Sequence, residues 1–160
     1  MTLVTYYSRT GHNRKAAQDI AGALGADIEE ITDLRDRSGI LGFIIAVIDT
    51  IRKKPAQIGE IKKNPAGYDT VIIGTPVWGR AEALAVRTYL LKYGNSIKKA
   101  AYFSVGGGDK NNRPVQAMEK LTGKKGIASV TFNDSDLKPA NKGRYDSKLY
   151  GFIGQLKKSG

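Results

Sequence analysis

Hydrophobic positions recur along the chain with two different periods. The apolar runs at 3–7, 70–74 and 100–105 are almost uninterrupted, which is typical of strands buried on both faces. Between 16 and 24 the apolar residues instead fall three or four positions apart and stop at Gly25, which predicts an amphipathic helix. The same two patterns predict further strands at 27–31 and 127–132, and further helices at 82–93, 113–121 and 145–157.

Strands and helices therefore alternate, as they do in βαβ units around a parallel sheet. The first, third and fourth strands are mostly apolar, so we expect them at the centre of the sheet. The second and fifth alternate apolar and polar residues, so we expect them at its edges. These patterns of apolar and polar residues fit the strand order 2-1-3-4-5 of a doubly wound, five-stranded α/β fold. A length of 160 residues predicts a single domain over 1–160.

The segment 38–54 fits this pattern poorly. It reads SGILGFIIAVIDTIRKK and is apolar on nearly all sides until Asp49, unlike a simple surface helix. We interpret it as a second helix packed on the sheet, because both faces of a parallel sheet need cover. Contact with a partner or with a membrane surface is the alternative. Its apolar run at 40–48 is too short for a transmembrane segment.

The net charge of +11 is unevenly distributed. Residues 1–97 carry 13 Lys and Arg against 10 acids (13 − 10 = +3), and residues 98–160 carry 13 against 5 (13 − 5 = +8). This asymmetry fits either an anionic partner or lysines on solvated helix faces. No recognisable basic motif with interleaved aromatic residues accompanies the charge, so we expect no specific nucleic-acid binding.

The absence of cysteine excludes disulfides, thiolate nucleophiles, iron–sulfur ligation and cysteine-built zinc sites. We expect no metal site. The first strand begins at once, with no basic stretch before it. We therefore expect no signal peptide and a cytoplasmic location.

Ligands of open parallel sheets bind beyond the carboxyl ends of the strands, and three predicted loops leave that edge. The first directly precedes a helix, whose free N–H groups and dipole favour a phosphate. Its Ser8, Thr10 and Asn13 can donate to phosphate oxygens; a plain N-cap cluster is the alternative. The candidate phosphate loop comprises Ser8, Arg9, Thr10, Gly11, His12 and Asn13.

The two other loops offer an aromatic ring and close backbone approach. The second holds the only tryptophan, whose flat apolar face suits a ligand ring, although burial in the core is the alternative; it comprises Pro76, Val77, Trp78 and Gly79. The third lets the backbone approach a ligand without side-chain clashes, although a turn without function is the alternative; it comprises Gly106, Gly107, Gly108 and Asp109.

Several other phosphate-binding classes are excluded by missing motifs. The chain has no Gly-Lys-Ser/Thr for a nucleoside triphosphate, and no Gly-x-Gly-x-x-Gly follows the first strand. The end of that strand also lacks the acidic residues that a receiver domain needs. A phosphate loop beside a flat aromatic side chain instead favours a phosphorylated planar ring.

These residues resemble a known family. The loop 8–13 resembles the Ser/Thr-x-Thr-Gly-x-Thr fingerprint of flavodoxins, Trp78-Gly79 resembles the Trp-Gly pair of their second flavin loop, and 86–90 is similar to part of their third helix. The resemblance covers nearly the whole chain. It implies non-covalently bound FMN, with 8–13 at the phosphate and with 76–79 and 106–109 beside the isoalloxazine.

The sequence departs from the flavodoxin pattern in three ways. Asn13 replaces the last threonine of the fingerprint but keeps a donor. The third loop lacks the tyrosine that commonly stacks on the second flavin face, which leaves that face open to a substrate. Flavodoxins are acidic and this chain is basic, so we expect a redox partner protein that differs from the usual ones and has an acidic surface.

Three functions fit these observations. The first is a flavodoxin-like electron-transfer protein, in which FMN does the redox chemistry and no side chain is catalytic. The second is an FMN-dependent NAD(P)H oxidoreductase that acts on a quinone or another small acceptor. The third is a basic module that has lost flavin and binds an anion or nucleic acid. His12 is a candidate proton donor only for the second function; otherwise it is a loop residue beside the phosphate.

Overall fold

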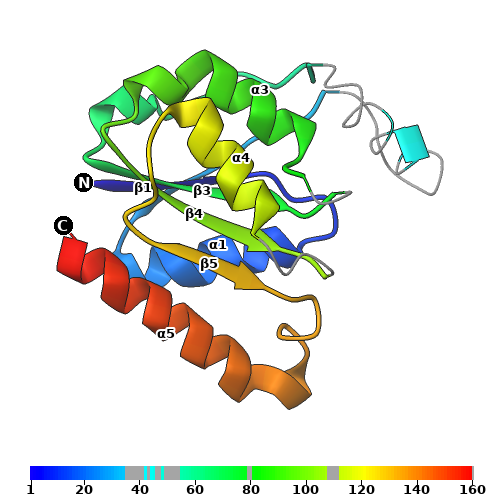
Figure 1. Ribbon diagram of the computed structural model, residues 1–160, viewed down its shortest axis with the longest axis vertical. Coiled ribbons are helices and arrows are strands. Elements are labelled where there is room, and N and C mark those ends of the chain that lie inside the picture. The colour runs from blue at the N-terminus through cyan, green and yellow to red at the C-terminus, as the bar shows by residue number, and fades with distance from the viewer. Residues whose placement is uncertain are drawn as a thin grey trace.

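Five parallel strands form one sheet in the computed structural model, which describes residues 1–34, 42, 44, 45, 48, 55–78, 81–107 and 112–159. The strands lie in the order β2-β1-β3-β4-β5 (Figure 1). Their bounds are Thr2–Tyr6 for β1, Asp27–Glu30 for β2, Thr70–Pro76 for β3, Lys99–Val105 for β4 and Ser129–Phe132 for β5. The predicted fold class and strand order are both confirmed.

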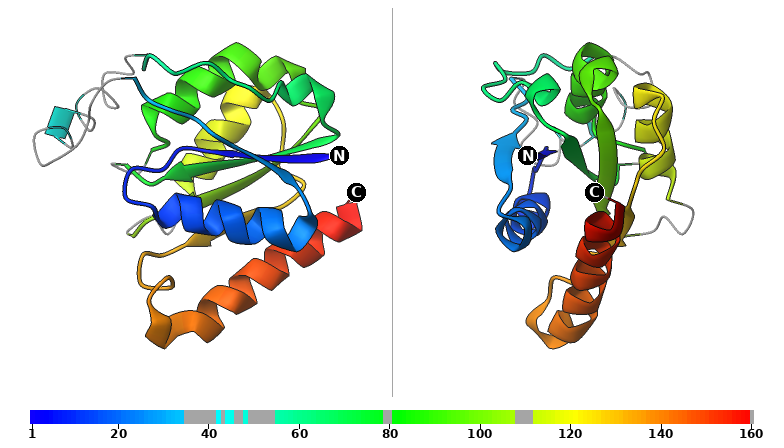
Figure 2. Two further views of the ribbon diagram at one scale, coloured as in Figure 1. Left: turned by 180° about the vertical axis from the view of Figure 1, so that it is seen from behind. Right: turned by 90° about the vertical axis from the view of Figure 1, so that its left-hand side faces the viewer.

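Helices cover both faces of this sheet. α1 (His12–Leu24) and α5 (Lys142–Ser159) lie on one face, and α3 (Leu84–Tyr93) and α4 (Arg113–Thr122) lie on the other (Figures 1 and 2). Each face has its own hydrophobic core. None of the helices in the described part of the chain combines the length and apolar character that crossing a membrane requires.

The central strands are buried, as their nearly continuous apolar sequences predict. Every residue of β3 after Thr70, and every residue of β4 after Lys99, is buried. The edge strand β2 is only partly covered. The helix α1 buries Ala16, Ala17 and Ile20 and ends at Gly25, whose φ of 60° is the left-handed conformation that favours glycine.

Most predicted bounds hold within two or three residues. The start of α3, two residues later than predicted, has a clear cause. Helix was predicted from position 82, but Ala83 is extended and donates its N–H to Thr75 Oγ1 at 2.9 Å. This bond holds Ala83 in an extended conformation, so the helix begins at the next residue, Leu84.

The segment 38–54 falls largely outside the described ranges. Two backbone hydrogen bonds join the chain on either side of it: Leu34 donates to Gln57 at 2.8 Å, and Gly59 donates to Thr32 at 2.9 Å. Ala56 also donates to Thr88 Oγ1 on α3 at 2.9 Å. The described residues on the two sides of the segment are therefore bonded to each other and to α3.

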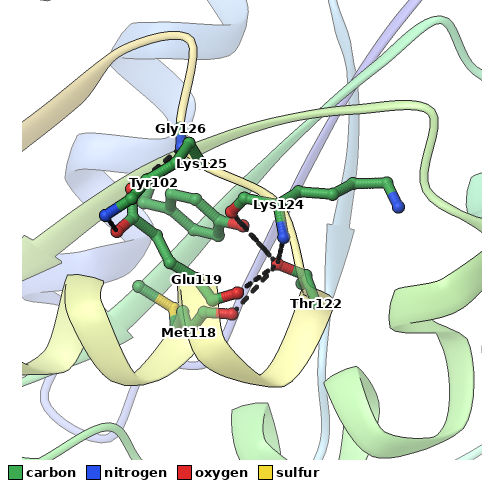
Figure 3. A network of polar contacts seen from close by, with 7 residues as sticks. All are labelled: Tyr102, Met118, Glu119, Thr122, Lys124, Lys125 and Gly126. Carbon is green, nitrogen blue, oxygen red and sulfur yellow. Dashed lines mark hydrogen bonds and ion pairs between the residues drawn. The ribbon is translucent and has the colours of Figure 1, made fainter.

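A polar network surrounds Tyr102 of β4, between the end of α4 and the chain that enters β5 (Figure 3). The Tyr102 hydroxyl in β4 lies 2.6 Å from Thr122 Oγ1 and donates to the Lys124 carbonyl at 3.0 Å. Burial raises the pKa of Tyr102 to about 12, so the hydroxyl stays a neutral donor. Glu119 accepts from the Gly126 N–H at 2.9 Å. These bonds tie the end of α4 to the chain that enters β5.

We predict that Gly74→Ala destabilises the fold while Gly22→Ala does not. A Cβ on Gly74 would overlap the fully buried ring of Phe103, and overpacking of this kind costs about 1–3 kcal/mol. Gly22 lies inside α1 with no atom within 4 Å of the added carbon, so alanine there should stabilise by about 0.5–1 kcal/mol. Urea unfolding of both variants measures the difference. Equal stability of the two would contradict the described packing of β3 on β4.

Candidate functional site

The three loops selected from the sequence leave the sheet at the same edge. This follows because β1 pairs with β3 and β3 pairs with β4, both in parallel. Contacts continue just beyond the strands. Tyr7 donates its N–H to the Gly74 carbonyl at 3.2 Å, and Val77 donates to the Val105 carbonyl at 3.1 Å. The first loop therefore adjoins the second, and the second adjoins the third.

The first loop turns directly into α1. Ser8 Oγ accepts from the Gly11 N–H at 3.1 Å, and Gly11 has a φ of 91°, which other residues rarely adopt. No side chain caps α1 in the described structure. Its first-turn N–H groups, at the positive end of the helix dipole, are thus oriented toward the loop without a side-chain acceptor. Arg9, Thr10 and His12 are exposed beside them.

Asn13 is placed differently from its neighbours. Its side chain is buried, with only 3% of the residue exposed, and its Oδ1 has no hydrogen-bond partner among the described residues. Buried polar atoms without a partner are uncommon. A carbonyl oxygen accepts hydrogen bonds, so any bond from Asn13 to a phosphate oxygen has to come from Nδ2 or from the backbone N–H. Its role as a phosphate donor stays a prediction.

A cluster of hydrogen-bonded polar side chains attaches the start of α1 to the sheet. Arg14 makes two bonds to the Glu30 carboxylate, at 3.1 and 2.9 Å, and the Tyr6 hydroxyl donates to the same carboxylate at 3.0 Å. Burial, with the neighbouring Glu30 charge, raises the pKa of Tyr6 to about 12. The bidentate Arg14 pair fixes the helix terminus to the carboxyl end of β2.

Trp78 lies in the core in this structure. Only 5% of the residue is exposed, and its ring meets Tyr7 edge-to-face with centroids 5.6 Å apart. Trp78 and Ala81 exchange two backbone hydrogen bonds: the Trp78 N–H donates to the Ala81 carbonyl at 2.9 Å, and the Ala81 N–H donates to the Trp78 carbonyl at 2.8 Å. The loop thus makes a tight reversal, with Pro76 buried and Val77 partly exposed before it. Stacking of Trp78 on a ligand ring stays a prediction, and it needs more exposed indole than is present here.

Gly106 is the residue that lets the second and third loops approach each other. Its φ is 152°, and an added Cβ would lie 2.8 Å from Val77 Cβ. Its N–H donates to the Phe132 carbonyl at 3.0 Å, which ties the third loop to β5 as well. Gly107 follows and is exposed. The predicted site residues Gly79, Gly108 and Asp109 lie outside the described residues.

A fourth loop, after β5, also reaches this edge, and sequence reasoning missed it. His12 Nδ1 lies 2.9 Å from Asp134 Oδ1, and both side chains are about half exposed. His12 therefore has a partner, on a residue 122 positions away. The polar stretch Asn133 to Asp136 directly after the last strand was the available signal, since it occupies the same position as the three loops that were chosen.

The loop that carries Asp134 is held by a buried carboxylate two residues later. Asp136 is fully buried; its Oδ2 accepts from the Asn133 N–H at 2.8 Å and from Lys148 Nζ at 2.6 Å. Lys148 also donates to the Thr131 carbonyl at 3.0 Å. Burial alone would raise the pKa of Asp136, but these donors lower it below its ordinary value. The carboxylate thus joins β5, the loop and α5.

The arrangement has counterparts among solved structures, although the sequence matches no protein-family model and no curated protein. A flavoprotein from Lactobacillus acidophilus NCFM, solved in complex with FMN, is 25% identical over 85% of this chain and 95% of its own, with a TM-score of 0.66. Oxidised flavodoxin 2 from Bacillus cereus is 14% identical over 96% and 98% of the two chains, with a TM-score of 0.59.

This chain has the flavodoxin fold. A flavodoxin, WrbA-like protein from Agrobacterium tumefaciens shares it too, at 14% identity over 97% of this chain and 94% of its own and with a TM-score of 0.55. The resemblance noted in the sequence is therefore matched by the fold. In the flavodoxin fold the strand order places the crevice between the loops after β1 and β3, where Ser8–Thr10 and Pro76–Trp78 lie here.

We predict that Asp136→Asn costs roughly 1.5–3 kcal/mol at pH 7, because it weakens hydrogen bonds between charged groups. The pKa of Asp136 is lowered on folding, so its stabilising effect is present above the ordinary pKa and is lost as pH falls through the folded one. The deficit of the variant should therefore shrink below about pH 4. Asp146→Asn, which removes an exposed pair with Lys142, is the matched control and should cost under about 0.5 kcal/mol. A deficit independent of pH would contradict this account.

We also predict weak quenching of Trp78 fluorescence by acrylamide in the flavin-free protein. The indole is the only one in the chain and is buried against Tyr7, so a dissolved quencher should reach it rarely. Unfolding in urea should increase the quenching constant several-fold. Equally strong quenching before and after unfolding would show that the indole is not in the core.

Proposed function

We propose that this protein binds FMN non-covalently at the carboxyl edge of its sheet and serves as an electron-transfer protein. The observation that carries the proposal is the first loop, in which α1 starts without a side-chain cap, next to a left-handed glycine and the exposed Thr10. The FMN complex of the Lactobacillus flavoprotein, which shares 95% of its length with this chain, supports the same cofactor.

The chemistry of the first loop fits a phosphate. Backbone N–H groups at a helix start donate to phosphate oxygens, and the helix dipole favours their negative charge. Thr10 is exposed and can add a hydroxyl donor, while the Ser8 hydroxyl already orders the turn through Gly11. The basic chain, with its net charge of +11, adds long-range attraction for an anion. The loop itself contains no acidic residue, and the one carboxylate described in contact with it, Asp134 beside His12, is about half exposed to solvent.

The second and third loops fit a planar ring through their backbones. Val77 and Gly106 lie in contact, and glycine at 106 keeps this region free of a side chain that would displace Val77. Such loops can offer N–H and carbonyl groups to the polar edge of an isoalloxazine. FMN, when bound, supplies the redox chemistry. The chain's own residues would bind the cofactor and orient it, with the start of α1 at its phosphate and the second and third loops at its ring.

An FMN-dependent oxidoreductase is the second candidate. The third loop contains no aromatic residue between 106 and 112, so one flavin face lacks the tyrosine common in flavodoxins and is open to a small acceptor such as a quinone. The WrbA-like neighbour has the same fold. Steady NAD(P)H oxidation by the FMN-loaded protein with a quinone, and without a partner reductase, would favour this candidate over an electron carrier.

We predict that FMN binds much more tightly than riboflavin and that Thr10→Val removes part of this difference. Loss of one hydrogen bond to a charged group costs about 1.5–3 kcal/mol, or roughly tenfold to more than a hundredfold in affinity for FMN. Riboflavin affinity should not change. Calorimetric titration of each flavin into each protein measures the four affinities.

The matched control is Thr32→Val, which removes an exposed hydroxyl from the loop after β2 and should leave both affinities unchanged. If FMN and riboflavin bind equally well to the wild type, the phosphate site does not exist and the proposal is wrong. If neither binds, the protein is a flavodoxin-fold module with another function.

A further inference from the structure

His12, at the start of α1, is linked to a loop on the far side of the proposed phosphate site. It is the first residue of the helix, and its Nδ1 lies 2.9 Å from Asp134 Oδ1 in the loop after β5. It is also the only histidine in the chain. A carboxylate that bonds one ring nitrogen fixes the orientation of an imidazole and thereby directs the other nitrogen.

The two permanent cations in the first turn of α1 are already paired with acids. Arg14 makes its two bonds to Glu30 at the end of β2. Lys15 Nζ lies 2.7 Å from Asp19 Oδ2, one turn further along the helix. His12 is the remaining residue of this turn that can carry positive charge. Its Nε2 has no hydrogen-bond partner in the described part of the chain, so this nitrogen can bond a ligand.

Asp134 occupies a fixed position between the first and third loops. Figure 1 shows the loop after β5, in orange, beside the blue start of α1. Two residues before Asp134, the Phe132 carbonyl accepts from the Gly106 N–H at 3.0 Å; two residues after it, Asp136 is buried. The second oxygen of the Asp134 carboxylate, Oδ2, lies 4.0 Å from the position that a Cβ on Gly107 would take. The carboxylate thus bonds the helix start through one oxygen and adjoins the third loop through the other.

We propose that His12 belongs to the phosphate site and that Asp134 is its positioning residue. The inference rests on the proposed function, because it assigns both side chains to the phosphate of FMN. Asp134 accepts a hydrogen bond from Nδ1–H, and Nε2–H donates to a phosphate oxygen. Both ring nitrogens are donors only in the imidazolium form, and the anions on its two sides favour that charged form.

The sign of one mutational effect separates this role of Asp134 from that of a simple charge. A carboxylate near a phosphate repels it, so removal of Asp134 would raise FMN affinity if the residue acted through its own charge. If Asp134 acts through His12, its removal lowers FMN affinity. The imidazole then loses both its orientation and the anion that stabilises its positive charge.

The test is calorimetric titration of FMN and of riboflavin into the wild type, His12→Ala, Asp134→Ala and the double variant at pH 7. His12→Ala should weaken FMN binding roughly tenfold to a hundredfold, the range for one hydrogen bond to a charged group. Asp134→Ala should weaken it about two- to tenfold, the range for an ordinary hydrogen bond. The double variant should bind FMN no more weakly than His12→Ala alone. Riboflavin affinity should stay the same throughout.

NMR of the single imidazole gives a readout that a purely structural link would not change. We expect the His12 ring signals to shift on addition of FMN and to stay in place on addition of riboflavin. In the FMN complex at pH 7, the nitrogen spectrum should show protons on both ring nitrogens. This doubly protonated form should be less populated in the FMN complex of Asp134→Ala.

The matched control is Asp69→Ala, which removes one acidic charge that is 70% exposed. Asp69 directly precedes β3, so it lies at the other end of a strand whose seven residues span about 20 Å. Screening at physiological salt reduces charge effects over such a distance, and both flavin affinities should stay as in the wild type. Thermal unfolding of every variant checks that a loss of affinity is not a loss of the fold.

Three results would overturn the inference. One is unchanged FMN affinity in His12→Ala while the wild type still prefers FMN to riboflavin; the flavin proposal then stands and the assignment of His12 falls. Another is tighter FMN binding by Asp134→Ala, which would make Asp134 a repelling charge. The third is an imidazole spectrum that responds equally to both flavins. A wild-type protein that binds neither flavin would overturn both proposals together.

Discussion

The hydrogen-bond ladders that join β1 to β3 and β3 to β4 are parallel, and this places three chain reversals at one edge of the sheet. A parallel strand cannot return through a hairpin, so each reversal leads into a helix that covers a face. Both consequences are visible here: α1 begins directly at the first loop, and α3 begins eight residues after Pro76. For this strand order, a ligand crevice is expected beyond the first and third strands before any side chain is considered.

The loops at that edge are held by bonds that reach into the sheet. Thr75 fixes the start of α3, Gly106 lets the third loop lie against Val77, and Asp136 ties the loop after β5 to Lys148. Thr75, Gly106 and Asp136 are themselves buried, so the site loops start from fixed positions even where the residues that follow are exposed. Sites that start from such positions are more precise than sites on free loops.

The sequence was sufficient for the fold because the hydrophobic periods of central strands, edge strands and α1 differ clearly, and burial follows them. It was less informative about the site. The alternation of faces that orients strand residues no longer applies once a strand has ended, so it could not show that the Trp78 ring points into the core. The His12–Asp134 contact joins residues 122 positions apart, and no local pattern encodes such a pair. The apolar excess of 38–54 was visible, but the exposure of its described isoleucines, Ile44, Ile45 and Ile48, was not.

The central claim is that FMN binds at this edge with its phosphate at the start of α1. Amide NMR of the labelled protein during titration with FMN tests it most directly. We expect the largest shift changes at the N–H groups of Thr10, Gly11 and His12, further changes at Gly106, and none in the second half of α5. Riboflavin should shift the Gly106 region and leave the α1 start nearly unmoved. Shift changes confined to the groove that Lys15, Asp19, Tyr145 and Leu149 line between α1 and α5, or changes at the α1 start that are equal for both flavins, would contradict the account.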